Sequence, residues 1–108
     1  MHIISGNNIT LTRGDTLKVQ VTLYKNGAEY TPEAGDVIRF AMKKEYTDAL
    51  PVLSKTIPNE TCLLVIDPQD TKSLAFGQYV YDIEITEADG TVDTFIAEAA
   101  FNIAPEVD

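Results

Sequence analysis

The chain has 108 residues with 17 acidic and 8 basic side chains, a formal net charge of −9, one histidine, one cysteine and no tryptophan. This length suffices for about one domain with a modest core, without metal or disulfide staples. The negative charge disfavours binding to nucleic acids and to anionic membrane surfaces, and a single cysteine excludes an internal disulfide.

No linker, repeat or low-complexity tract divides the chain. We expect one domain over residues 1–108, with its core over about 3–103 and a frayed tail over 104–108. Residues 1–6 lack the basic region and apolar run of a secretion signal, and no apolar run reaches the roughly 20 residues that span a bilayer. We therefore expect synthesis in the cytoplasm, without secretion by a signal peptide and without a membrane partner.

Apolar and polar residues alternate in the first half of the chain, which predicts strands with one buried and one wet face. Ile9 and Leu11 indicate a first strand. The next segments are 15–25 and 36–43, and their predicted inward residues are Leu17, Val19, Val21, Leu23, Ile38, Phe40 and Met42.

The second half continues the pattern. Residues 51–57 predict a short strand, whose Pro51 favours either an edge position or the start of a strand. Residues 61–67 are apolar almost throughout, so alternation cannot say which side chains face the core. Residues 78–86 place Tyr79, Tyr81, Ile83 and Ile85 inward, and 68–74 could form one helical turn after a capping residue and a proline. About seven strands result, and we predict an all-β, immunoglobulin-like antiparallel β-sandwich.

Two turns predict hairpins. Asn26-Gly27 is a strong hairpin signal, although it leaves the place of Tyr30 open. For the last hairpin we favour a three-residue loop of Ala88-Asp89-Gly90, with Gly90 left-handed in a bulge, because a two-residue turn would mix core and solvent faces. This register pairs Ile83 with Phe95 and Tyr81 with Ala97, and it directs the following residues inward: Phe95, Ala97, Ala99, Phe101 and Ile103.

Residues that usually carry catalysis are scarce. His2 stands at the end of the chain, where we expect a solvent-exposed residue and not a base. Cys62 lies in the most apolar predicted strand, where we expect a buried, unreactive thiol. We predict no catalytic residue and no cofactor.

Carboxylates concentrate in the second half of the chain, and they comprise Asp67, Asp70, Asp82, Glu84, Glu87, Asp89 and Asp93. Such oxygens can bind calcium or act as a catalytic pair. However, Asp82 and Glu84 fall on the wet face of a strand, the turn explains Asp89, and no calcium-loop spacing is present. A solvated acidic surface is the favoured interpretation, and no metal site is predicted.

The glycines and tyrosines have structural interpretations. Isolated glycines beside strands read as turn or bulge residues, not as a phosphate cradle; they are Gly14, Gly27, Gly35, Gly77 and Gly90. Tyr79 follows the predicted helical turn and could hydrogen-bond back across that corner, as a tyrosine does in immunoglobulin-like sandwiches. The alternative is that Tyr79 and Tyr81 are simply large core residues.

Several strand and turn motifs carry a family resemblance over nearly the whole chain. They are residues 9–16, 35–40, 68–71, 77–83, 88–94 and 101–103. With these motifs the chain resembles small proteins encoded in phages and prophages of Gram-positive bacteria. It also resembles, more distantly, the immunoglobulin-like N-terminal module of phage baseplate upper proteins, but it lacks their helical and receptor-binding extensions.

The resemblance implies a noncatalytic structural or assembly protein of a phage tail, baseplate or capsid, made in the bacterial host cytoplasm and carried in the virion. Its partners would be other phage structural proteins, docked at a strand edge or an outward sheet face, with a homo-oligomer left open. Outward apolar candidates for these contacts are Tyr24, Val80 and Ile96. The alternative is a carbohydrate- or cell-surface-binding module, which the lack of tryptophan and the inward tyrosines make less favourable.

Overall fold

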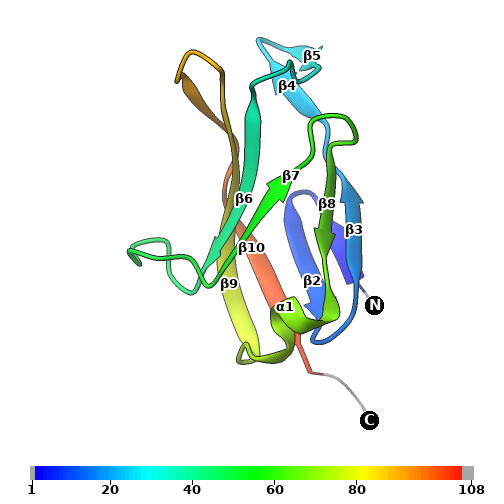
Figure 1. Cartoon of the computed structure of the whole chain (residues 1–108). Coiled ribbons are helices and arrows are strands. Elements are labelled where there is room, and N and C mark those ends of the chain that lie inside the picture. Colours follow the sequence, from blue (N-terminus) through cyan, green and yellow to red (C-terminus); the bar gives the residue numbers. More distant parts are fainter. Residues whose placement is uncertain (1, 106–108) are drawn as a thin grey trace.

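The computed structural model describes residues 2–105, without the side chains of residues 2–5, 97 and 98. Ten strands and one short helix follow each other in this part of the chain (Figure 1). They are β1 His2–Ser5, β2 Asn8–Thr12, β3 Leu17–Gln20, β4 Leu23–Lys25, β5 Ala28–Tyr30, β6 Val37–Lys43, β7 Leu53–Ile57, β8 Leu63–Ile66, α1 Pro68–Lys72, β9 Gly77–Thr86 and β10 Val92–Ala104.

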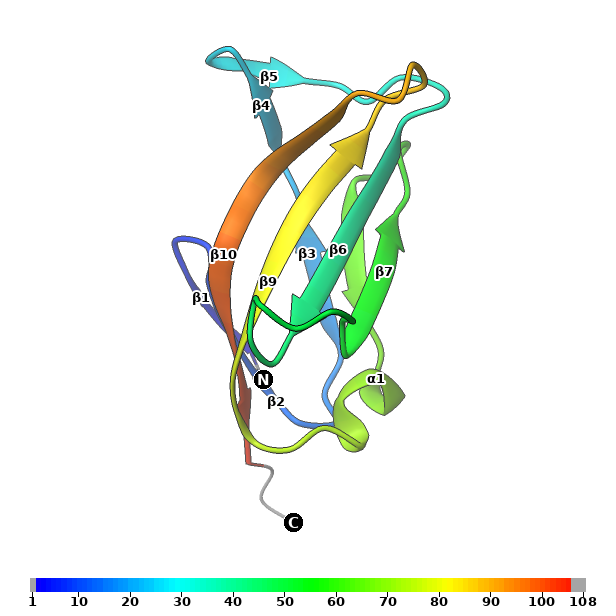
Figure 2. The same cartoon turned by 90° about the vertical axis from the view of Figure 1, so that its left-hand side faces the viewer.

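The strands form two layers around one core. The larger sheet has the order β1-β2-β10-β9-β6-β7, and Figure 2 shows β10, β9, β6 and β7 side by side in it. The pair β3-β8 lies on the opposite side of the core, and β4 and β5 form a separate hairpin at one end (Figure 1). The predicted all-β sandwich is therefore confirmed.

The strand count and one pairing differ from the prediction of about seven antiparallel strands. β2 runs parallel to β10, with Ile9 opposite Phe101, so the large sheet is mixed. The segment 15–25 divides into two strands with different partners. β3 pairs with β8 within the second layer, whereas β4 pairs with β5 through the Asn26-Gly27 turn. This predicted hairpin is confirmed, and it places Tyr30 opposite Leu23.

The predicted inward faces of β6 and β9 form the centre of the core. Ile38, Phe40 and Met42 are buried, and so are the four predicted residues of β9. Phe40, Tyr81 and Phe101 pack as an aromatic cluster with ring centroids 5.2–6.1 Å apart. In the ambiguous segment 61–67, Leu64 and Ile66 are the buried residues.

The β9–β10 hairpin has the predicted turn but not the predicted register throughout. The Gly90 amide donates to the Glu87 carbonyl over 2.9 Å, and the Glu87 amide donates to the Thr91 carbonyl over 2.8 Å, which closes the expected three-residue loop. Two bulges in β10 then shift the pairing, so that Ile83 lies opposite Ile96, and Tyr81 opposite Ala99. The predicted partners Phe95 and Ala97 were wrong because each bulge inserts a residue that the alternating pattern does not reveal.

The two bulges together shift the register by two residues, which preserves the side of the sheet on which each later residue lies. Ala99, Phe101 and Ile103 are buried as predicted, while Phe95 is half-buried. Ala97 was also predicted to point inward, but its side chain lies outside the described residues.

A helical corner connects the two layers before β9. The predicted helical turn is confirmed as α1, with Asp67 as N-cap and Pro68 as its first residue. After it, the Tyr79 hydroxyl donates to the Ala75 carbonyl over 2.8 Å. Tyr79 therefore makes the corner hydrogen bond that the sequence suggested, in addition to packing in the core.

Candidate docking surface

One side of the large sheet is not covered by the second layer. We call this surface, formed by β6, β7, β9 and β10, the outer face (Figure 2). Because side chains alternate along each strand, it receives the residues between the core residues. From β6 and β9 these are Val37, Arg39, Ala41, Lys43, Gln78, Val80, Asp82, Glu84 and Thr86.

A loop overhangs one end of the outer face. Residues 44–52 connect β6 to β7 and cross in front of the lower part of the sheet in Figure 2. Between this 44–52 loop and the strands is a groove of about 280 Å³. Its lining includes Tyr46 and Pro51 from the loop, and Ala41, Val80 and Asp82 from the sheet.

The charges beside the groove are balanced. Arg39 lies directly opposite Glu84 on the neighbouring strand, and its Nη2 is 3.0 Å from Glu84 Oε1. Burial, with a smaller effect from the negative charge of Glu84, raises the pKa of Asp82, and Lys43 and Arg39 partly oppose this shift. Two acids and two bases therefore face solvent together here, on a chain with a net charge of −9.

Exposed apolar side chains concentrate on this side of the molecule. Of the seven large hydrophobic residues that are most exposed in the described part of the chain, five belong to the outer face and its loop: Val37, Tyr46, Leu50, Val52 and Val92. Val37 and Val92 flank Thr86 on the two strands beside β9, at the end of the face away from the loop. Tyr46 is 63% and Leu50 is 79% exposed. Such a concentration is typical of an interaction surface.

The edge of the same sheet is less suited to docking. β7 is one of the two edge strands of this sheet, in agreement with the edge position that was one of the two predicted, and its Lys55 falls on the same side as the buried Ile57. Lys55 Nζ is 2.6 Å from Asp70 Oδ2, so the charge is held inward by an ion pair. A charged residue that points inward on an edge strand opposes pairing with a further strand. The outer face, not the β7 edge, is therefore the candidate docking surface.

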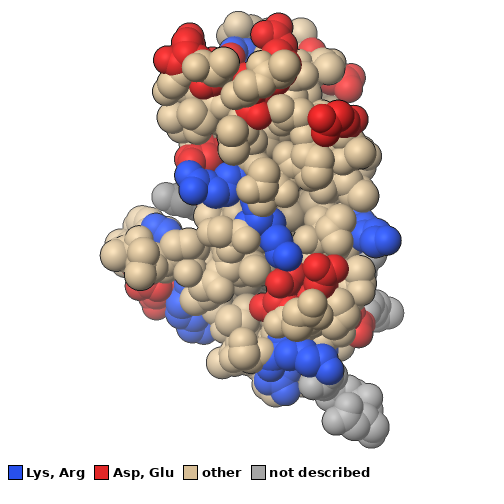
Figure 3. Space-filling view, in the orientation of Figure 1, with Lys and Arg blue, Asp and Glu red and all other residues tan. Residues whose placement is uncertain are grey.

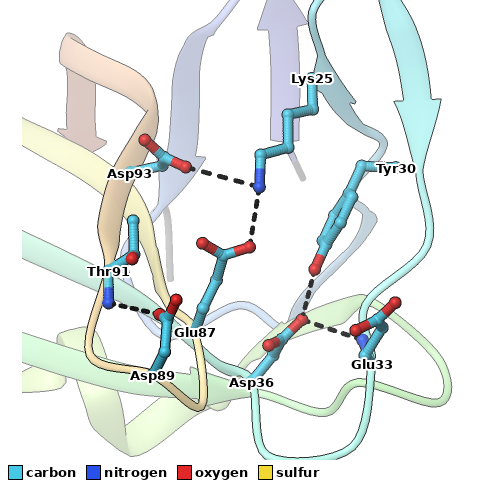
Figure 4. Close-up of polar contacts among 8 residues, drawn as sticks. All are labelled: Lys25, Tyr30, Glu33, Asp36, Glu87, Asp89, Thr91 and Asp93. Carbon is cyan, nitrogen blue, oxygen red and sulfur yellow. Dashed lines mark hydrogen bonds and ion pairs between the residues drawn. The ribbon is translucent and has the colours of Figure 1, made fainter.

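A second group of polar residues lies at the end of the sandwich that carries β4 and β5 (Figure 4). Lys25 Nζ donates to Glu87 Oε1 over 2.7 Å and lies 3.9 Å from Asp93. The Thr91 amide donates to Asp89 over 2.9 Å, as the turn interpretation of Asp89 requires. We call this end the acidic end, because Figure 3 shows acidic side chains gathered there.

Tyr30 and Asp36 bind each other within the acidic end. The Tyr30 hydroxyl and the Glu33 amide both donate to Asp36 Oδ2, over 2.6 and 2.9 Å. These hydrogen bonds lower the pKa of Asp36, and the same carboxylate, with burial, raises the pKa of Tyr30 to about 12. The bonds hold the loop before β6, which gives these residues a structural role.

The three sequence candidates for contact residues have different positions. Tyr24 is 60% exposed on β4, and Val80 is half-buried and lines the groove. Ile96, expected to point outward, is half-buried and packs against the core, because a bulge places it opposite Ile83. Sequence reasoning missed Tyr46 and Leu50, although two large apolar residues outside any alternating segment were a usable signal.

The remaining residues that the sequence singled out have the following positions in the structure. Cys62 is half-buried, but it precedes β8 and does not lie in the strand; burial raises the pKa of its thiol. Asp67 and Asp70 face Lys55, at 3.8 and 2.6 Å. The side chain of His2 lies outside the described residues. The predicted turn glycines all have positive φ.

No protein-family model, curated protein or solved structure matches this chain. Among the described residues, no helix has the length and apolar character needed to cross a membrane. Nor does this part of the chain bring three or more histidine, cysteine or carboxylate side chains into an arrangement that could hold a metal ion.

Proposed function

We propose that the chain is a noncatalytic docking module of a phage or prophage particle. It joins tail, baseplate or capsid subunits through its outer face, after synthesis in the cytoplasm of the bacterial host. The observation that carries the docking role is that five of the seven most exposed large hydrophobic residues in the described part of the chain belong to one uncovered sheet face and the loop that overhangs it. The phage assignment and the immunoglobulin-like character rest on the resemblance of the strand and turn motifs, and the tyrosine corner supports the latter.

The polar residues support a noncatalytic role. The carboxylates of the acidic end bind a lysine, a tyrosine and backbone amides that hold neighbouring loops. Asp82 and Glu84 lie on the outer face beside Arg39, where they give a docking surface its polar component.

Particle purification tests this proposal. The protein should sediment with intact particles, and a variant with Tyr46→Ser and Leu50→Ser should be lost from them, because these side chains provide exposed apolar contact area. Tyr24→Ser is the matched control, since Tyr24 is equally exposed but lies on β4. Absence of the unaltered protein from purified particles would refute the proposal.

A second candidate function is carbohydrate or cell-surface binding near Tyr24. This exposed ring borders a shallow recess with Asn26, Asp93 and Thr94, a combination of an aromatic face and polar groups that suits a sugar. Glycan-array binding that Tyr24→Ala abolishes would favour this function, whereas an array without signal would remove it.

A further inference from the structure

The turn between β4 and β5 carries the one asparagine–glycine pair of the sequence. Asn26 and Gly27 both have a left-handed φ, 54° and 80°, and both are exposed. A two-residue hairpin turn needs this backbone geometry, and asparagine and glycine are the residues that adopt it. A side chain placed on Gly27 would meet no atom within 4 Å, so the peptide bond between the two residues faces open solvent.

The polar groups of this pair are not held by hydrogen bonds. Among the described residues, no hydrogen bond uses the side-chain amide of Asn26 or the backbone amide of Gly27. Other asparagine side chains are fixed, because Asn59 and Asn102 donate hydrogen bonds to other segments and Asn8 accepts one from β10. The Asn26 side chain can therefore rotate toward the Gly27 nitrogen.

The following residue separates Asn26 from similar positions in the chain. The side-chain carbonyl carbon of an asparagine is attacked most readily by the nitrogen of a following glycine, which has no side chain to obstruct the approach. A bulkier residue follows every other asparagine of the sequence. In the Asp89-Gly90 turn, the Gly90 amide donates to the Glu87 carbonyl and the Asp89 carboxylate accepts from the Thr91 amide, both over 2.9 Å, so the corresponding groups are occupied.

The hairpin that carries the turn opens more readily than the large sheet. β4 and β5 have three residues each, and in the described part of the chain they pair with each other alone (Figure 1). A two-stranded hairpin of this size has little stability of its own, and such elements open locally at a low cost in free energy. Brief opening releases the turn from its left-handed geometry, which allows the Asn26 side chain to approach the next nitrogen.

We propose that Asn26 is a site of spontaneous deamidation. The Gly27 nitrogen loses its proton and bonds to Asn26 Cγ, and the carbon–nitrogen bond of the side-chain amide breaks. The leaving nitrogen takes up a proton and departs as ammonia, which leaves a succinimide ring. Water then bonds to either ring carbonyl carbon, the bond from that carbon to the Gly27 nitrogen breaks, and the nitrogen regains a proton if it leaves the ring. One water is consumed, one ammonia is released, and no atom is oxidised or reduced.

The reaction changes both the charge and the backbone of the turn. The new carboxylate adds one negative charge to the acidic end, in the recess that Tyr24 and Asp93 also line. Opening of the ring at Cγ gives aspartate, which suits the same turn. Opening at the main-chain carbonyl gives isoaspartate, which adds a methylene group to the backbone and disturbs the register that places Lys25 opposite Ala28.

Charge-resolved separation of the aged protein tests the proposal. The purified chain is held in mildly alkaline buffer, because the attacking amide must lose its proton, and a synthetic peptide of residues 23–30 is the positive control for the conditions. We expect an acidic species with the mass difference between a carboxyl group and an amide. Peptide mapping should locate the change at Asn26 before any other asparagine has reacted, and an enzyme that methylates isoaspartate should label part of this species.

Two variants that keep the turn sharpen the test. Asn26→Gly removes the reactive amide but retains a pair that suits the turn, so the first acidic species should be lost. Asn26→Asp should carry the added charge from the start and elute with the product that the methylating enzyme leaves unlabelled. A chain that stayed unaltered after the control peptide had lost its amide would overturn the proposal. So would another asparagine that reacted first, or the same acidic species in Asn26→Gly.

Discussion

Replacement of Tyr79 by phenylalanine isolates the hydrogen bond at the helical corner. The ring is buried and stays in place, and the ammonium of Lys44, 4.8 Å from the ring centroid, keeps its cation–π contact. Only the hydroxyl that donates to the Ala75 carbonyl over 2.8 Å is removed. A hydrogen bond of this kind contributes about 1 kcal/mol, and the carbonyl on the exposed Ala75 can bind water instead. We expect the free energy of unfolding to fall by about 1 kcal/mol.

Urea unfolding measures this loss. With a slope of about 1–3 kcal/mol per molar urea, the midpoint should fall by roughly 0.3–1 M while the slope stays constant. Tyr24→Phe is the control, because its exposed hydroxyl should contribute less than about 0.5 kcal/mol. If Tyr79→Phe matched this control, Tyr79 would be a core residue without an energetic role at the corner.

Three further outcomes follow from local geometry. Gly90→Ala should lower the free energy of unfolding by about 1–2 kcal/mol, because Gly90 has a left-handed φ. Gly35→Ala should lower it by about 1 kcal/mol more, because the new methyl group would also lie 2.9 Å from a neighbouring methyl group. Thermal unfolding compares the two variants. Tyr30→Phe should flatten the pH dependence of the free energy of unfolding in both alkali and acid. In alkali, the hydrogen bond to Asp36 stabilises the fold below pH 10 and is lost toward pH 12, as the Tyr30 phenol ionises. In acid, the same hydrogen bond is lost as the pH falls through the lowered pKa of Asp36. Equal slopes in both proteins would contradict this coupling. Lys55→Val should aggregate faster, as measured by light scattering, than the control Lys18→Val at an exposed position of β3. Equal aggregation rates would show that the inward charge of Lys55 does not protect the β7 edge.

Local signals in the sequence predicted the elements well where one rule dominated. Strict alternation identified the buried residues of β6 and β9, and the Asn-Gly turn identified the β4–β5 hairpin. The proline after Asp67 predicted α1. In each case the residues that decide the structure are neighbours in the chain.

Features that depend on distant parts of the chain were missed. The parallel pairing of β2 with β10 joins segments about 90 residues apart, and no local pattern encodes it. The two bulges in β10 left the buried side correct beyond the second bulge, but between the bulges the sides are exchanged, which misplaced Ile96. The candidate site was missed for the same reason: whether Tyr46 and Leu50 lie inside or outside depends on how the 44–52 loop meets the sheet.

β2 lies between β1 and β10, and its Leu11 is opposite His2 on one side and Ile103 on the other. The first and last strands consequently leave the sandwich at the same pole, away from the β9–β10 turn. A fluorescent tag or a tether fused at either terminus would extend from this pole, so a surface-immobilised copy would display its far pole to incoming molecules. The 44–52 loop lies toward this same pole, so such fusions leave the acidic end uncovered but stand beside the docking groove (Figure 2).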